Sequence, residues 1–269
     1  MRVNGLELNV RIVGEGYPFI WGHGLMGSMA MEDAMPVFDW EHLAEGERMI
    51  RYDARGHGRS EASANLDDYS WANLGRDMLA LADALHIERF IAGGQSMGSA
   101  TALCAALAAP ERIKALVLVN PPTAWETRAA QGAGYEQMAA LISRKGIAGL
   151  VEAMQSQAPT PPWLWEWMAQ TGAGGDLAGA FGALDTSTLP LVLRGAAQTN
   201  LPPREELRGL AMPTLILAWT DDPGHPISTA ESVAELLPNA RLTSASNMDE
   251  LLRWPSLIRE FVEQQISQA

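Results

Sequence analysis

The stretch of sequence that decides the fold is FIAGGQSMGSATALCAAL, residues 90–107. It opens with an apolar run typical of a buried strand and closes with small and apolar residues typical of a helix packed close to a sheet. Between the two lies the pentapeptide GQSMG, residues 94–98. A sharp strand-to-helix turn strains the backbone of its central residue, so small residues are needed two positions away on each side. Gly94 and Gly98 meet that requirement.

Ser96, at the centre of this turn, is therefore a candidate nucleophile. The N-terminus of the following helix would face its hydroxyl, and the partial positive charge there favours an oxyanion. We expect the backbone N–H of Met97 to be one donor to that oxyanion. A second predicted strand, residues 19–21, runs into a His-Gly loop that offers the N–H of Leu25 as the other donor. We interpret the side chain of His23 in this loop as structural.

Short apolar runs alternate with helical segments along most of the chain. Predicted strands cover residues 49–52, 115–119 and 214–218, and predicted helices cover 70–85 and 97–109. Strands that are apolar on both faces and alternate with helices predict an α/β fold, with a mostly parallel central sheet covered by helices on both faces. The other expected elements are an opening hairpin around Asn4-Gly5, helices over 228–237 and 255–265, and a strand over 241–243.

Residues 122–208 interrupt this alternation. The segment is helix-prone, rich in tryptophan and proline, and has no convincing strand. We interpret it as a helical cap inserted between two sheet strands, so that residues 1–121 and 209–269 form the core. The aromatic run of residues 161–168 favours a pocket for a small to medium, largely apolar substrate. Plain packing of the cap on the core, or an oligomer contact, explains the same run equally well.

Composition excludes several classes of partner. The chain has 19 basic and 32 acidic residues, a net charge of −13, and such a surface repels nucleic acid and anionic membrane. Cys104 is the single cysteine and the N-terminus has no apolar leader, which favours the cytoplasm. The five histidines show no metal-ligand spacing, and no glycine-rich phosphate loop is present. We therefore expect a small-molecule substrate, no metal and no cofactor, with homo-oligomer formation left open.

The segment DARGHGRS, residues 53–60, is a third motif. Taken in order with the His-Gly loop, the serine turn and the late Asp-Asp-Pro, it resembles the α/β-hydrolase superfamily, in its branch of capped serine esterases, lactonases and carbon–carbon hydrolases. The resemblance covers nearly all of the predicted core and is weak in the predicted cap. It implies an α/β-hydrolase fold and a mainly architectural role for residues 53–60, including His57. It also implies a catalytic carboxylate after the strand at 214–218, where Asp222 matches best.

The sequence departs from this family at the general base. The family carries a histidine in the loop after its last strand, whereas here that loop, residues 244–250, reads SASNMDE. By its spacing to Pro255, either Asn247 or Met248 occupies the usual place. Neither side chain takes a proton from a serine at neutral pH.

Three explanations of the missing histidine stay open. His225 acts as the base from the neighbouring loop, three residues beyond Asp222, with Asp222, Asp249 or Glu250 orienting its ring. Alternatively the base is absent and the fold binds a ligand without turnover, or the chain carries a substitution. Among the five histidines, His225 is the one well placed for the first explanation.

The sequence thus predicts a cofactor-independent serine hydrolase that cleaves an ester, thioester or lactone. Ser96 forms the acyl-enzyme, His225 moves the proton and Asp222 orients the imidazole. A serine at the turn argues against the haloalkane dehalogenase and epoxide hydrolase branches, which carry an aspartate there. Two alternatives remain: hydrolysis of a carbon–carbon bond on the same triad, and a non-catalytic ligand-binding protein on a hydrolase scaffold.

Overall fold

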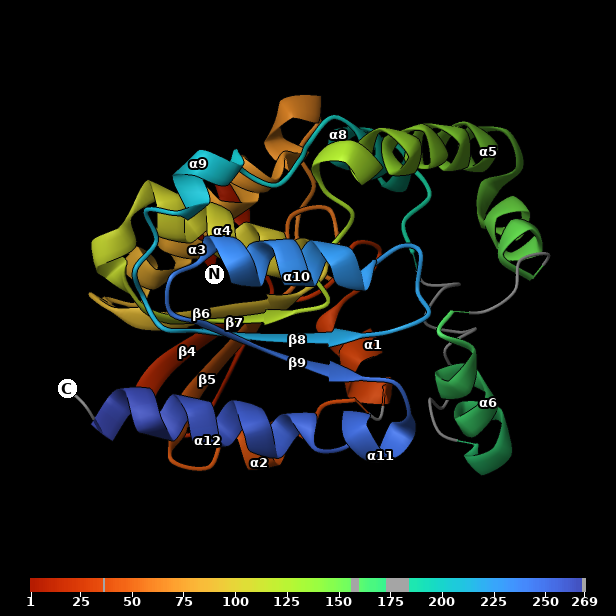
Figure 1. Cartoon of the computed structure of the whole chain (residues 1–269). Coiled ribbons are helices and arrows are strands. Elements are labelled where there is room, and N and C mark those ends of the chain that lie inside the picture. The colour runs from red at the N-terminus through yellow and green to blue at the C-terminus, as the bar shows by residue number, and fades with distance from the viewer. Residues whose placement is uncertain (36, 156–159, 173–183, 268–269) are drawn as a thin grey trace.

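A seven-stranded sheet forms the centre of the chain (Figure 1). The structure is a computed structural model that describes residues 1–35, 37–155, 160–172 and 184–267. The strand order is β3-β5-β4-β6-β7-β8-β9, parallel throughout except for the antiparallel edge pair of β3 and β5. The bounds are β3 (Val10–Val13), β4 (Tyr17–Gly22), β5 (Glu47–Tyr52), β6 (Phe90–Gln95), β7 (Ile113–Val119), β8 (Thr214–Trp219) and β9 (Ala240–Ala245).

Both faces of the sheet are buried because successive strand residues alternate between two apolar clusters. Ile20 and Leu116 face one cluster, and their neighbours Phe19 and Val117 face the other. The first cluster is completed by α3 (Trp71–Ala84), α4 (Met97–Ala108) and α10 (Ile227–Leu236), and the second by α2 (Trp40–Leu43), α11 (Met248–Leu251) and α12 (Trp254–Ser267). Figure 1 shows these sets on opposite sides of the sheet. The predicted α/β fold with a mostly parallel sheet is confirmed.

Local sequence signals explain most element ends. Ser70 caps α3 by accepting a hydrogen bond from the N–H of Asn73. The opening hairpin of β1 (Arg2–Val3) and β2 (Leu6–Glu7) turns at Asn4 and Gly5, which have φ of 49° and 85°. The short elements that the pattern did not predict are β3, α1 (Met29–Ala34), α2, α11, η1 (Leu66–Tyr69) and η2 (Pro110–Arg112).

Residues 122–208 contain helices and, in their described part, no strand. These are η3 (Trp125–Thr127), α5 (Arg128–Gln155), α6 (Pro162–Thr171), α8 (Leu189–Ala197) and α9 (Arg204–Leu207). Gly146, with φ of 65°, interrupts α5. Helices α5 and α8 pack together through their own apolar cluster, and α5 and α6 lie on the side toward which β8 and β9 point (Figure 1). The division into core and cap stays a prediction, and residues 156–159 and 173–183 of the predicted cap lie outside the described residues.

A search of the described helices finds none that combines the length and the apolar character needed to cross a membrane.

Candidate active site

Ser96 lies at the bend between β6 and α4. Its φ of 54° and ψ of −112° form a combination that residues other than glycine rarely adopt. The flanking glycines explain how the bend is held. A Cβ on Gly98 would lie 1.9 Å from the carbonyl oxygen of Gly22 in β4, and one on Gly94 would lie 2.4 Å from the carbonyl carbon of Gly98. The predicted need for small residues on both sides of the serine is therefore met by direct backbone contact.

The backbone of the bend is fixed while the hydroxyl stays free of it. The N–H of Ser96 donates to the carbonyl of Val119 in β7 at 2.9 Å, and its own carbonyl accepts from the N–H of Ser99 at 3.0 Å. The side chain of Ser96 makes no capping hydrogen bond to α4. Its hydroxyl is thus available for another partner.

Asp222 and His225 come from a single turn after β8. One carboxylate oxygen of Asp222, Oδ1, accepts the N–H of Gly224 at 2.8 Å, and the carbonyl of Asp222 accepts the N–H of His225 at 3.1 Å. These bonds are those of an Asx-type turn, which aspartate favours. The turn places the ring of His225 beside the carboxylate that precedes it by three residues.

The structure brings the three predicted residues into one line. Nδ1 of His225 lies 2.8 Å from Oδ2 of Asp222, and Nε2 lies 2.7 Å from Oγ of Ser96. A carboxylate only accepts hydrogen bonds, so Nδ1 carries the proton and Nε2 presents its lone pair to the serine hydroxyl. The side chain of Asp222 is 7% exposed and that of His225 is 22% exposed. The pair is therefore partly shielded from water.

Hydrogen bonds keep Asp222 ionised. Burial alone would raise the pKa of its carboxyl, but the hydrogen bond and charge of His225, with bonds from Trp219 and Gly224, outweigh it and hold the pKa at about 2. Asp222 is therefore a carboxylate at neutral pH, as an orienting group for an imidazole must be.

The two expected oxyanion donors lie next to the serine. Met97 is the first residue of α4, and Gly24, which precedes Leu25, approaches Ser96 so closely that a Cβ on it would lie 3.6 Å from the Cβ of Ser96. Within the described part of the chain, neither the N–H of Met97 nor that of Leu25 donates a hydrogen bond. Both N–H groups are thus free to donate hydrogen bonds to a negatively charged oxygen of a bound ligand.

The two histidines interpreted as structural are buried and bonded to backbone. Nε2 of His23 accepts the N–H of Ala54 at 2.9 Å, so its Nδ1 donates to the carbonyl of Gly24 at 2.7 Å. His57 contacts the carbonyl of Arg55, and burial together with the neighbouring His23 lowers its pKa to about 3. His23 thereby fixes the loop that carries Leu25.

Comparison with known protein families agrees with this architecture. Residues 17–247 match the family described as the alpha/beta hydrolase fold. The chain belongs to the α/β-hydrolase family.

Relatives of this α/β-hydrolase include proteins named as hydrolases and lactonases. It is 32% identical over 202 residues to a protein of Caulobacter sp. (strain K31) named "Putative carbamate hydrolase RutD", covering 74% of this chain and 72% of that one. It is 27% identical over 184 residues to 3-oxoadipate enol-lactonase 1 of Acinetobacter baylyi, covering 68% and 65%. The enol-lactonase structure from Burkholderia xenovorans LB400 superimposes with a TM-score of 0.79, at 24% identity and 98% coverage of both chains. This last likeness shows the fold.

The loop after β9, where the family carries its histidine, has other contacts in this α/β-hydrolase. Met248 is buried at the start of α11, and Asn247 caps that helix by accepting the N–H of Glu250. The carboxylate of Glu250 accepts from the N–H and hydroxyl of Ser246. Among the described residues, His225 is paired with Asp222 and with neither Asp249 nor Glu250. The alternative that one of these two acids orients the imidazole is therefore not supported.

Sequence reasoning missed Trp219, the last residue of β8. Its indole N–H donates to Oδ2 of Asp222 at 2.9 Å, and its ring meets that of His225 edge-on at 6.2 Å between centroids. A tryptophan that ends an apolar strand is indistinguishable in sequence from a core residue. Its position three residues before the acid is the one signal that places it at the site.

Segments of the predicted cap adjoin the triad. The hydroxyl of Thr160 donates to Oδ1 of Asp222 at 3.3 Å. Leu25 and Met26, in the loop with the oxyanion donor, pack against the apolar cluster of α5 and α8, together with Tyr135 and Met138. Leu25 and Met26 thus connect the loop beside the serine to the apolar cluster of the predicted cap.

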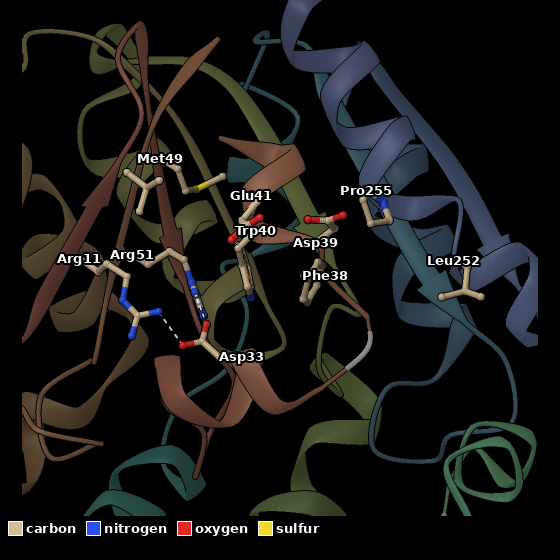
Figure 2. Close-up of a pocket in the computed structure, with 11 residues that line it drawn as sticks. Arg11, Asp33, Phe38, Asp39, Trp40, Glu41, Met49, Arg51, Leu252 and Pro255 are labelled. Carbon is tan, nitrogen blue, oxygen red and sulfur yellow. Dashed lines mark hydrogen bonds and ion pairs between the residues drawn. The ribbon is translucent and has the colours of Figure 1, made fainter. Parts of the chain in front are cut away.

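No group of three or more His, Cys, Asp or Glu residues in the described ranges is arranged to hold a metal ion. A separate pocket of about 730 Å³ lies at the β3 edge of the sheet, and none of its lining residues belongs to the triad. Figure 2 shows Arg11 and Arg51 of this pocket directed toward Asp33, with which both form ion pairs. Its two arginines are already neutralised, so neither stands free for an anionic ligand.

Proposed function

We propose that the protein is a cofactor-independent serine hydrolase that cleaves an ester, thioester or lactone of a small to medium, largely apolar substrate. The observation that carries this proposal is the continuous hydrogen-bonded line from Ser96 through His225 to Asp222, with separations of 2.7 and 2.8 Å. A nucleophile within hydrogen-bond reach of a base, itself oriented by a third group, is the arrangement that activates a hydroxyl.

In the acylation step, Oγ of Ser96 attacks the carbonyl carbon while its proton passes to Nε2 of His225. The carbonyl oxygen becomes an oxyanion, which the N–H groups of Leu25 and Met97 stabilise, a donor of this kind contributing about 3 kcal/mol. The carboxylate of Asp222 stabilises the imidazolium without taking its proton. The tetrahedral intermediate then collapses, and the imidazolium protonates the leaving oxygen or sulfur as the bond to it breaks.

In the deacylation step, the same groups act on water. Neutral His225 takes a proton from a water molecule as it attacks the acyl carbon, and the oxyanion forms again between the same two amides. Collapse of this intermediate returns the proton to Oγ of Ser96 and releases the acid. One base therefore serves both halves of the reaction.

The substrate class rests on the walls of the site and on the relatives. Leu25 and Met26, in the loop beside Ser96, pack against the apolar cluster of α5 and α8, and an apolar neighbourhood of this kind favours an acyl group with little charge. Two relatives are named for carbamate hydrolysis and for enol-lactone hydrolysis. Both reactions attack a carbonyl carbon that carries a heteroatom leaving group, as the proposed reaction does.

The two alternatives differ in their support. A scaffold without a base is disfavoured because the imidazole of His225 lies 2.7 Å from the serine hydroxyl. Hydrolysis of a carbon–carbon bond would use the same triad, and no contact of the described residues favours it over ester cleavage.

The direct test is a turnover assay with p-nitrophenyl esters of increasing acyl length, simple lactones and a vinylogous diketone. We expect saturable turnover of esters or lactones, with an initial burst of p-nitrophenol that reports the acyl-enzyme. Ser96→Ala is the matched control and should abolish the burst. Turnover of the diketone alone would replace the proposed reaction by its carbon–carbon alternative, and ester turnover that survives in Ser96→Ala would contradict the proposal.

A further inference from the structure

The acid of the triad has a second side-chain partner in the sheet. Oδ2 of Asp222 accepts a hydrogen bond from Nε1 of Trp219 at 2.9 Å and also contacts Nδ1 of His225 at 2.8 Å. We propose that Trp219 is a positioning residue of the hydrolytic site, which fixes the carboxylate of Asp222 and thereby the ring of His225. This inference rests on the proposed function, because it assigns Trp219 a part in the same proton transfer.

The hydrogen bonds around the carboxylate show why a second donor matters. Oδ1 is held by the N–H of Gly224 at 2.8 Å and more weakly by the hydroxyl of Thr160 at 3.3 Å. Gly224 belongs to the same turn as Asp222 itself. Without the indole, the imidazole that Oδ2 has to orient would be its only partner among the described residues. Trp219 is therefore the group that ties this oxygen to the rigid sheet.

The position of Trp219 is itself fixed by burial and by a hydrogen bond to the neighbouring strand. It is 6% exposed, and its main-chain N–H donates to Oδ1 of Asn120 at 3.0 Å. Asn120 follows Val119, whose carbonyl holds the N–H of Ser96. The strand end that fixes the nucleophile is therefore bonded to the strand end that fixes the acid. This chain of contacts sets the separation of Ser96 and His225 from within the sheet.

The bond from Trp219 matters particularly because His225 lies in the same turn after β8 as Asp222. Asp222 and His225 share one short turn, so a shift of that turn moves both residues relative to Ser96. A bond from outside the turn to the carboxylate is what prevents such a shift. Misplacement of catalytic groups by a fraction of an ångström to an ångström lowers rates strongly, since the reaction needs aligned atoms.

Trp254 offers a matched control for the indole N–H. Its ring stacks on that of Trp219, with centroids 6.1 Å apart and planes 18° apart. Trp254 is fully buried, and its Nε1 has no hydrogen-bond partner in the described part of the chain. Two neighbouring indoles thus provide similar packing, and one of them donates to the triad.

The experiment compares Trp219→Phe and Trp254→Phe with the wild type on the best p-nitrophenyl ester. We expect Trp219→Phe to lower kcat about tenfold with KM changed less than about twofold, because the lost bond acts in the chemical step. Trp254→Phe should keep kcat within about twofold of the wild type. The sulfur analogue of tryptophan at position 219, which keeps the ring and lacks the N–H, should reproduce the loss seen in Trp219→Phe.

A second measurement follows the His225–Asp222 bond itself. The proton on Nδ1 of His225 should give a downfield NMR signal, assigned by its absence in His225→Ala. We expect this signal to shift in Trp219→Phe and to stay in place in Trp254→Phe. Equal kcat in Trp219→Phe and the wild type, or an equal loss in both Phe variants, would overturn the inference. If no variant and no wild type turned over any ester, the proposed function would fail, and the NMR signal alone would decide whether Trp219 positions the pair.

Discussion

Nε2 of His225 lies 2.7 Å from Oγ of Ser96, although 129 positions separate the two residues in the chain. The loop after β9, where the family resemblance places the histidine, holds Asn247 and Met248 instead, with Met248 buried in α11. In the proposed mechanism, the acid and the base therefore both come from the turn after β8. The proposed chemistry depends above all on His225.

Removal of the serine or of the histidine should have nearly the same effect. Ser96→Ala and His225→Ala are each expected to lower kcat on an activated ester by at least about 10³-fold, and the double variant should fall no further, because the groups act as a unit. Steady-state kinetics on the purified variants measure this. Losses that add on a logarithmic scale would mean that the two residues act independently.

Asp222→Asn should keep the fold and lose most activity. An asparagine in this place favours the wrong tautomer of His225, and the expected fall in kcat is about 10³- to 10⁴-fold. Asp249→Asn is the matched control, since its position was the alternative source of the orienting acid, and it should leave kcat unchanged. A large loss in Asp249→Asn with little loss in Asp222→Asn would reverse the assignment.

Gly98→Ala should disrupt the bend that presents Ser96. The new Cβ would lie 1.9 Å from the carbonyl oxygen of Gly22, a contact that requires the backbone of β4 or α4 to move. We expect a loss of several kcal/mol in unfolding free energy, about 3 or more, because overpacking against backbone relaxes poorly. Gly134→Ala, where a Cβ meets no atom within 4 Å, should be neutral or stabilising in the same thermal denaturation experiment. Equal melting temperatures for the two variants would contradict the close backbone approach.

The raised pKa of Glu47, the first residue of β5, should make the free energy of unfolding depend on pH. Glu47 is 4% exposed; burial and the nearby charge of Glu263 raise its pKa from 4.5 to about 7, although Arg259 opposes the shift. Below pH 4.5 both states are protonated. As the pH rises toward 7, the unfolded chain releases the proton and the folded chain keeps it, so the contribution of Glu47 to stability falls, by up to about 3 kcal/mol.

Glu47→Gln should remove this fall. Urea denaturation at about pH 5 and about pH 8 measures the difference in unfolding free energy, and the exposed Glu15→Gln variant serves as the control that keeps the wild-type slope. The neutral His57, with its lowered pKa of about 3, adds a rise in stability over the same range to every variant. The test is therefore the difference in unfolding free energy between the wild type and Glu47→Gln, and an equal difference at the two pH values would contradict the assignment.

The features that depend on local backbone geometry could be predicted from the sequence. The glycines two residues either side of Ser96 predict a bend because only a missing Cβ allows the contact with Gly22. The spacing of Asp222 and His225 predicts a shared turn, and His225 followed by elimination among five histidines. The alternation of apolar strands and helices likewise predicts a two-faced sheet.

The features that sequence alone did not yield depend on contacts between distant segments. Trp219 has the same local pattern whether its N–H is free or bonded to a carboxylate. Residues 10–13 form a separate edge strand by pairing with β5, which no local signal distinguishes from the end of the opening hairpin. The choice between Asp222 and the acids after β9 also required the fold, since all three follow neighbouring strands.

The measurement that tests the central claim most directly is the labelling of Ser96 by a fluorophosphonate, followed by intact mass and peptide mapping. We predict about one equivalent added at Ser96 in the wild type, and a labelling rate at least about 10³-fold lower in His225→Ala, because the hydroxyl then lacks its base. Equal labelling rates in the two proteins, or no labelling of the wild type at Ser96, would contradict the assignment of His225 as the base that activates this serine.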